Sequence, residues 1–155
     1  MMLAMCAGCA ASHGAVHVAP DESRPHITWE IRTGGDDGDR DFVCGSSQPA
    51  KSCVLPAGTD KVPTAATLHL LVHAAAQPTS YLGSMRAPFF GGDAHRKLGE
   101  VNATVEPGSR PVGTTVVGRA TSMPGKYTLA ISVDATQPGA QSPVRISQNV
   151  PVVVQ

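Results

Sequence analysis

The chain has 155 residues, the usual size of a single domain and enough to close one apolar core. Its 12 basic and 12 acidic residues give a formal net charge of zero, so nucleic acid is not expected as a partner, because no basic surface would neutralise its phosphates. Charged residues make up only 15 % of the chain beside 16 glycines and 13 prolines, which favours short strands joined by turns.

The N-terminal segment begins with small and apolar residues and contains Ala7-Gly8-Cys9. These three residues resemble the end of a lipobox, the sequence at which a bacterial lipoprotein is acylated on cysteine and cleaved. Cys6 stands where leucine is usual in that pattern. The resemblance implies lipidation of Cys9 and an exported protein, periplasmic or anchored to the outer membrane, that meets the membrane through its lipid anchor only.

We expect residues 1–25 to be a signal remnant and linker, and residues 26–155 to be the β-sandwich domain. A complete signal also has a charged start and an apolar stretch of about 7 to 15 residues, which do not precede Cys9. An ordinary cleaved signal and a cytosolic protein are therefore alternatives. A metal or redox site at Cys6 and Cys9 is a further alternative, although the next histidine, His13, follows too closely for a loop to fold back over zinc.

The first predicted strand covers residues 26–32. Ile27, Trp29 and Ile31 fall on one face of it, and polar residues fall on the other. We therefore expect the single tryptophan of the chain to lie in the core. A glycine-rich loop follows, and a second short strand is predicted at residues 41–44.

That loop holds a cluster of carboxylates, Asp36, Asp37, Asp39 and Asp41. Alternating carboxylates around a glycine are able to wrap calcium, which takes six to eight oxygen ligands. The cluster departs from the EF-hand pattern at its glycine and glutamate positions. A solvated turn that uses aspartate for its own backbone hydrogen bonds is the preferred interpretation, with calcium as the alternative and no other cofactor expected.

Cys44 and Cys53 are the remaining cysteine pair if Cys6 and Cys9 belong to the signal. Eight residues containing glycine and proline separate them, enough to bring two strand ends within bonding distance. We predict a disulfide between them, which also indicates an oxidising compartment, with two buried free thiols as the alternative. Residues 53–55 are predicted to form a strand that is the partner or neighbour of 41–44.

Residues 64–76 fit two patterns. In a strand, Leu68, Leu70 and Val72 share a face, whereas in a helix Thr64 would cap a different apolar stripe. We favour the strand because the other periodic segments have period two. His69 and the histidine four residues later would then lie about 13 Å apart, too far to share a metal ion.

Later strands are predicted at five places, each bounded by proline or glycine turns. They cover residues 80–86, 100–105, 114–120, 126–134 and 144–154. The last of them is interrupted near Asn149. Many short strands at this spacing are typical of a sandwich or barrel, and so the fold class is all-β with roughly seven to nine strands.

The segment Pro124 to Asp134 resembles the late strand of Ig-like domains in bacterial surface proteins, where a tyrosine after a glycine turn opens the strand. The closing segment Val150 to Val154 is similar to their last strand. The resemblance implies an Ig-like antiparallel β-sandwich in which the hydroxyl of Tyr127 ties back the preceding corner. It implies little about function, because this fold hosts many activities.

No nucleophile elbow or phosphate-binding loop occurs in the sequence. We therefore predict a non-catalytic module of the cell envelope, structural or binding a ligand or an envelope protein. The alternative is a periplasmic metal-binding protein, with calcium at the Asp36 to Asp41 loop, or an envelope enzyme.

Overall fold

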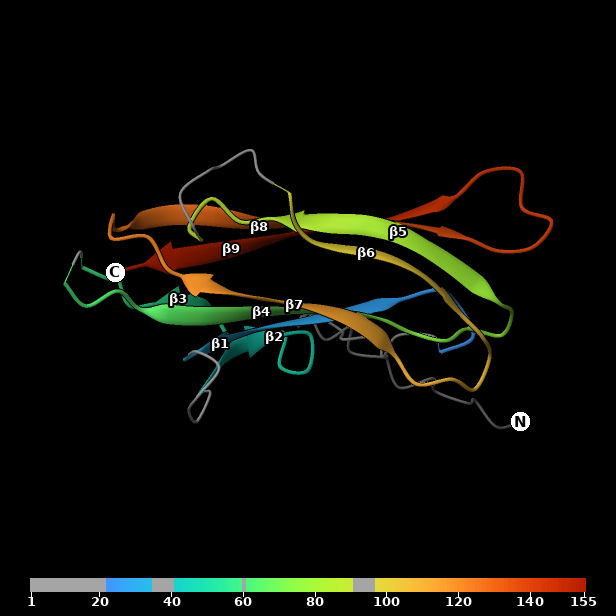
Figure 1. Cartoon of the computed structure of the whole chain (residues 1–155), viewed down its shortest axis with the longest axis horizontal. Coiled ribbons are helices and arrows are strands. Elements are labelled where there is room, and N and C mark those ends of the chain that lie inside the picture. Colours follow the sequence, from blue (N-terminus) through green and yellow to red (C-terminus); the bar gives the residue numbers. More distant parts are fainter. Residues whose placement is uncertain (1–21, 35–40, 60, 91–96) are drawn as a thin grey trace, which may run out of the picture.

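The computed structural model describes residues 22–34, 41–59, 61–90 and 97–155 (Figure 1). These residues form strands, turns and loops, and no helix able to cross a membrane is found among them. The described residues form nine strands, which are β1 (Ile27–Thr33), β2 (Asp41–Gly45), β3 (Cys53–Leu55), β4 (Ala65–Val72), β5 (Thr79–Arg86), β6 (Leu98–Val105), β7 (Val112–Arg119), β8 (Gly125–Thr136) and β9 (Val144–Val154).

The strands form two sheets that pack face to face, as Figure 1 shows. One sheet has the order β2-β1-β4-β7, and the other has the order β3-β9-β8-β5-β6. The predicted all-β sandwich is confirmed. Every pair of neighbours is antiparallel except β3 and β9, which run parallel, so the second sheet is mixed.

The core lies between the two inner faces, which follow from the alternation of apolar and polar residues along each strand. Residues 65–72 form a strand, and the helical alternative is wrong. Leu68, Leu70 and Val72 are fully buried against the other sheet, while Leu71 between them is 38 % exposed on the outer face. From the second sheet, Leu129, Ile131 and Val133 of β8 meet them.

The start of β8 has the expected tyrosine hydrogen bond. The hydroxyl of Tyr127 donates to the backbone oxygen of Met123 at 2.7 Å and so ties the strand to the turn before it. The ring of Tyr127 also packs edge-on against Phe89, with centroids 6.3 Å apart. This contact fixes the corner at which the chain enters β8.

The predicted interruption of the last strand is wrong, because β9 pairs with β8 without a break from Val144 to Val154. Asn149 lies opposite Ala130 in this ladder. The polar residue that breaks the pattern is Gln148, which faces inward between apolar neighbours and has a hydrogen-bond partner there. The strand therefore continues through Gln148, although this residue interrupts the apolar pattern of the inner face.

Cys44 at the end of β2 and Cys53 at the start of β3 are buried, and their Sγ atoms lie 2.08 Å apart. This is the distance of a disulfide bond, in agreement with the predicted pair. β3 is a neighbour of β2 through this bond but not its hydrogen-bonded partner, since it pairs with β9 in the opposite sheet. The cysteines thus join the two sheets along one side of the sandwich.

Candidate functional site: a groove between β1 and β9

A groove opens along the side of the sandwich that carries the disulfide. It exists because the two strands that cover this side are short. β2 pairs with β1 only from Glu30 onward, and β3 pairs with β9 only over residues 152–154. Within the described residues, the stretch 144–151 of β9 and the first part of β1 have no strand on their outer side. The groove measures about 1290 Å³, more than the roughly 300 to 1,000 Å³ of a typical small-molecule pocket.

The open edge of β9 presents backbone groups that have no partner among the residues that the structure describes. Gln155 bonds across to the loop after β3, because its N–H donates to Leu55 and its carbonyl accepts from Ala57. Successive residues of a strand direct these groups to opposite sides. Counting back from Gln155 in steps of two, the residues whose backbone groups point to the open side of β9 are Pro151, Asn149, Ser147 and Arg145, and of these Pro151 and Asn149 line the groove.

Pro151 agrees with this assignment. Proline has no N–H, and within a sheet it is tolerated where the missing donor would face away from the neighbouring strand. Its position on the open side leaves the ladder between β9 and β8 intact, with Pro151 opposite Thr128. The outward donors of this edge therefore end at Asn149.

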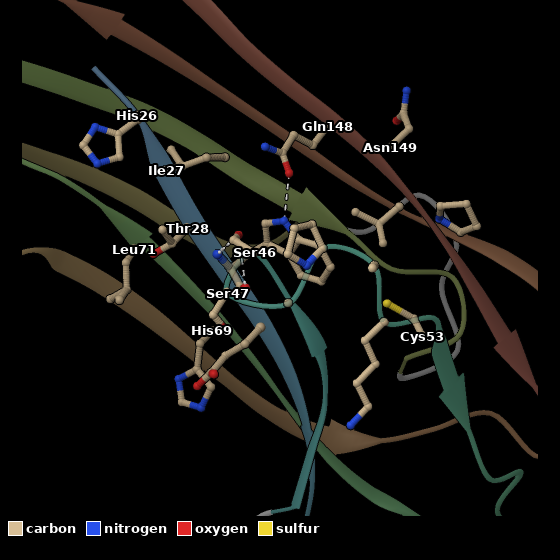
Figure 2. A pocket seen from close by; sticks show the side chains of 18 of the residues that line it. His26, Ile27, Thr28, Ser46, Ser47, Cys53, His69, Leu71, Gln148 and Asn149 are labelled. Carbon is tan, nitrogen blue, oxygen red and sulfur yellow. Dashed lines mark hydrogen bonds between the residues drawn. The ribbon is translucent and has the colours of Figure 1, made fainter. Parts of the chain in front are cut away.

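The floor of the groove is mainly apolar and half-buried. It is formed by Trp29 from β1 and by Ile146 and Val150 from β9, all packed against the core. Gln148 lies between the last two, and its side-chain oxygen accepts a hydrogen bond of 2.8 Å from the indole of Trp29. In Figure 2 a dashed line marks this bond, and Asn149 points the other way.

The loop after β2 closes the groove at one end. The N–H of Ser46 donates to the carbonyl of Trp29 at 2.9 Å, and the Oγ of Ser46 accepts from the N–H of Trp29 at 2.9 Å. The loop approaches β1 closely, because a Cβ added at Gly45 would lie 2.6 Å from the Trp29 oxygen. Ser46 thus satisfies both outward backbone groups of Trp29 at the point where β2 ends. The next residue of β1 whose backbone groups point to the same side is Ile27.

A pair of histidines stands where β1 begins. The rings of His26 and His73 stack with centroids 4.6 Å apart, and the Nε2 of His73 lies 2.7 Å from the hydroxyl of Thr28. Burial, and then the charge of His26, lower the pKa of His73 from its ordinary value, partly offset by Glu22. This pair favours a neutral His73 in the folded protein.

Of the predicted lipidation, disulfide and calcium residues that the structure describes, Cys53 lines the groove, and Cys44 and Asp41 do not. Cys9, Asp36, Asp37 and Asp39 lie outside the described residues, and so does the metal or redox alternative at the N-terminus. Asp41 is exposed at the start of β2. Cys53 lines the groove at its closed end.

The two histidines of the predicted fourth strand do not come together. The Nδ1 of His69 lies 3.0 Å from the hydroxyl of Thr115, whereas His73 contacts Thr28 and His26. In the part of the chain that the structure describes, no group of three or more His, Cys, Asp or Glu side chains lies close enough to hold a metal ion.

Sequence reasoning missed the groove. One signal was present, since Gln148 occupies an inward position between Ile146 and Val150 in a strand that is otherwise apolar on that face. An inward polar residue needs a partner, and here the partner is the tryptophan at the base of the groove. No family description matches the sequence, and no characterised protein matches it significantly.

Proposed function

We propose that this protein is an exported module of the cell envelope, attached by a lipid on Cys9, that works by binding another molecule in the groove between β1 and β9. The groove is the observation that carries the proposal. Its floor is apolar, as in most ligand-binding sites, and its wall is a strand edge whose backbone groups have no partner among the described residues and are able to pair with another chain.

The sandwich is proposed to be Ig-like. The run β9-β8-β5 in one sheet faces the run β1-β4-β7 in the other, which is the arrangement of the G-F-C and A-B-E strands of an Ig domain. Tyr127 stands near the start of the strand that corresponds to F, and its hydroxyl bonds back to Met123 as in the tyrosine corner. Such domains commonly serve as binding modules on cell surfaces.

Acylation tests the cellular part of the proposal. The gene is expressed with its natural upstream region in the presence of a fatty-acid analogue, and the envelope and cytosol are separated. We expect label in the envelope fraction and none in Cys9→Ser. Label that survives in Cys9→Ser, or protein confined to the cytosol, would contradict export by this route.

Photo-crosslinking tests the groove. A benzophenone amino acid replaces Ser47, which is exposed beside the groove, or Ser109, which is exposed in the turn between β6 and β7. We expect a discrete crosslinked product in cells from position 47 only. Equal patterns from the two positions would show that the groove is not the site of binding.

A further inference from the structure

We infer that the occupant of the groove is an extended segment of another polypeptide, which adds as a strand to the open edge of β9. The inference rests on the proposed role of the groove as the binding site and names the class of its ligand. Strand addition is a recurring mode of recognition in which backbone bonds supply affinity and alternate side chains supply specificity.

The backbone of β9 is suited to pair with an added strand. Arg145, Ser147 and Asn149 each direct an N–H and a carbonyl to the open side of β9, and Pro151 adds a carbonyl alone. Asn149 and Pro151 lie in the groove itself, and Ser147 and Arg145 continue the same edge beyond it. These groups recur at every second residue, which is the spacing at which a paired strand offers its own groups. A compact small molecule would satisfy only one or two of them, whereas an extended backbone satisfies all of them in register.

The position of the edge fixes where the new strand would lie. β3 already occupies the same side of β9 over residues 152–154, so the incoming strand would lie in line with β3 and end near Pro151. The disulfide and the loop around Ser46 stand at that end. The segment therefore continues the sheet along residues 144–151.

The floor determines which side chains the segment would carry. Every second side chain of an added strand would point toward the half-buried surface of Trp29, Ile146 and Val150. That surface favours apolar side chains, of valine or isoleucine size, at alternate positions. The other positions would face solvent beside Ser147 and Asn149, which are exposed and polar.

The test uses the full chain with its disulfide formed and a synthetic peptide as the probe. The peptide has about eight residues, alternating valine and threonine, with a lysine at each end and both termini blocked. A second peptide has the same side chains but carries N-methyl groups along one edge, which removes its donors on that edge. Binding is followed by the fluorescence of Trp29, the only tryptophan, which forms the floor of the groove.

Substitutions on the protein provide a matched set. Asn149→Pro removes an N–H that faces the groove and leaves the bonds to β8 in place, as the natural Pro151 does. Asn149→Ala keeps that N–H. Val117→Pro removes an outward N–H at the edge of β7, in the other sheet and away from the groove. A thermal melt of each variant establishes that it is folded before its binding is compared.

We expect the alternating peptide to bind the native chain, its affinity to fall about fivefold with Asn149→Pro, which removes one donor, and to fall further with the N-methylated peptide, which lacks several. The fivefold change is the one that corresponds to a single backbone hydrogen bond. Asn149→Ala and Val117→Pro should retain native affinity. Amide signals of Ser147 and Asn149 should gain protection from hydrogen exchange when the peptide is bound.

Four results would overturn the inference. Equal affinity for the N-methylated peptide would mean apolar binding without strand addition. A dimer that Asn149→Pro makes monomeric would mean that a second copy occupies the groove. Binding that appears only after deletion of residues 1–21 would mean that the chain's own N-terminal segment occupies it. Failure of the peptide to bind, together with crosslinking from Ser47, would leave the groove as a binding site for another class of ligand and refute strand addition alone.

Discussion

Trp29 and Gln148 are joined across the sandwich by a hydrogen bond of 2.8 Å from the indole nitrogen to the side-chain oxygen. They belong to β1 and β9, so this bond connects the two sheets at the base of the groove. A half-buried indole N–H without an acceptor costs free energy, which makes Gln148 a residue that both stabilises the fold and shapes the groove.

Replacing Gln148 with leucine should lower the free energy of unfolding by about 1 kcal/mol, because the indole N–H loses its acceptor and regains water only in part. Urea denaturation of Gln148→Leu beside the native chain measures the change. Gln141→Leu, in the exposed turn between β8 and β9, is the matched control and should leave the midpoint unchanged. Equal midpoints for Gln148→Leu and the native chain would show that the bond does not stabilise the fold.

Loss of the Tyr127 hydroxyl should destabilise the protein by about 1 kcal/mol, since Tyr127→Phe removes the bond to Met123 and leaves the ring in place. Tyr81→Phe is a useful comparison, because the hydroxyl of Tyr81 donates to the backbone of His73 at 2.6 Å and is the more buried of the two. Denaturation midpoints should fall in both variants, and at least as far for Tyr81→Phe. A Tyr127→Phe variant as stable as the native chain would argue against the structural role of this corner.

Reduction of the disulfide should lower the free energy of unfolding by about 2 to 3 kcal/mol, the value expected for closure of so short a loop in the unfolded chain. The comparison is between oxidised and reduced forms of the same protein in a thermal or urea melt. Cys44→Ala/Cys53→Ala should be insensitive to the reductant, which separates this bond from the cysteines near the N-terminus. Coincident melts of the oxidised and reduced native chain would refute the bond.

Stability should fall as the pH drops below about 6.5, the ordinary pKa of histidine. The folded state lowers the pKa of His73, chiefly by burial and then by the charge of His26. Between the unfolded and the folded pKa, the unfolded chain binds a proton that the folded chain does not, so unfolding becomes easier. Above the pKa of His73 in the unfolded chain, this group costs the folded state no stability. Below its pKa in the folded chain, the free energy of unfolding stops falling on account of His73.

Urea midpoints of the native chain and of His73→Gln, taken near neutral pH and at mildly acidic pH, measure this effect. The variant should lose less stability on acidification, because its amide does not titrate and is still able to bond Thr28. His26→Gln should also reduce the slope by removing the neighbouring charge. A native and a His73→Gln chain with the same pH dependence would show that another group is responsible.

Local alternation predicted most of the strands and their inner faces. It succeeded at residues 65–72 because Leu68, Leu70 and Val72 are buried as a strand requires. It did not predict the parallel pairing of β3 with β9, which depends on contacts across about a hundred residues of sequence rather than on either segment alone. Near Asn149 it treated the polar residues as a break in the strand, when the inward one of them, Gln148, has a partner in the other sheet.

The groove could not be predicted from local sequence patterns for a related reason. It arises from the difference in length between β2 and β1 and between β3 and β9, and only pairing reveals where each short strand stops along its neighbour. Trp29 was predicted as a core residue, and it does pack on the core, but part of it remains accessible at the groove. The disulfide was predictable, because a cysteine pair with a short polar loop between its members is a local pattern.

The parallel contact between β3 and β9 also determines how the domain would bear mechanical tension. A pull that enters through β1 reaches β3 at Cys53, and a pull on the chain after β9 acts at Gln155, so the two strands are drawn in opposite directions along their length. Their hydrogen bonds are then loaded in shear and share the force, whereas a hairpin pulled at its ends opens one bond at a time. The disulfide between Cys44 and Cys53 carries tension past the intervening loop directly to this contact. A domain tethered to a surface and pulled from its far end would therefore resist at the contact of β3 with β9 once the bonds between β1 and β4 have been loaded.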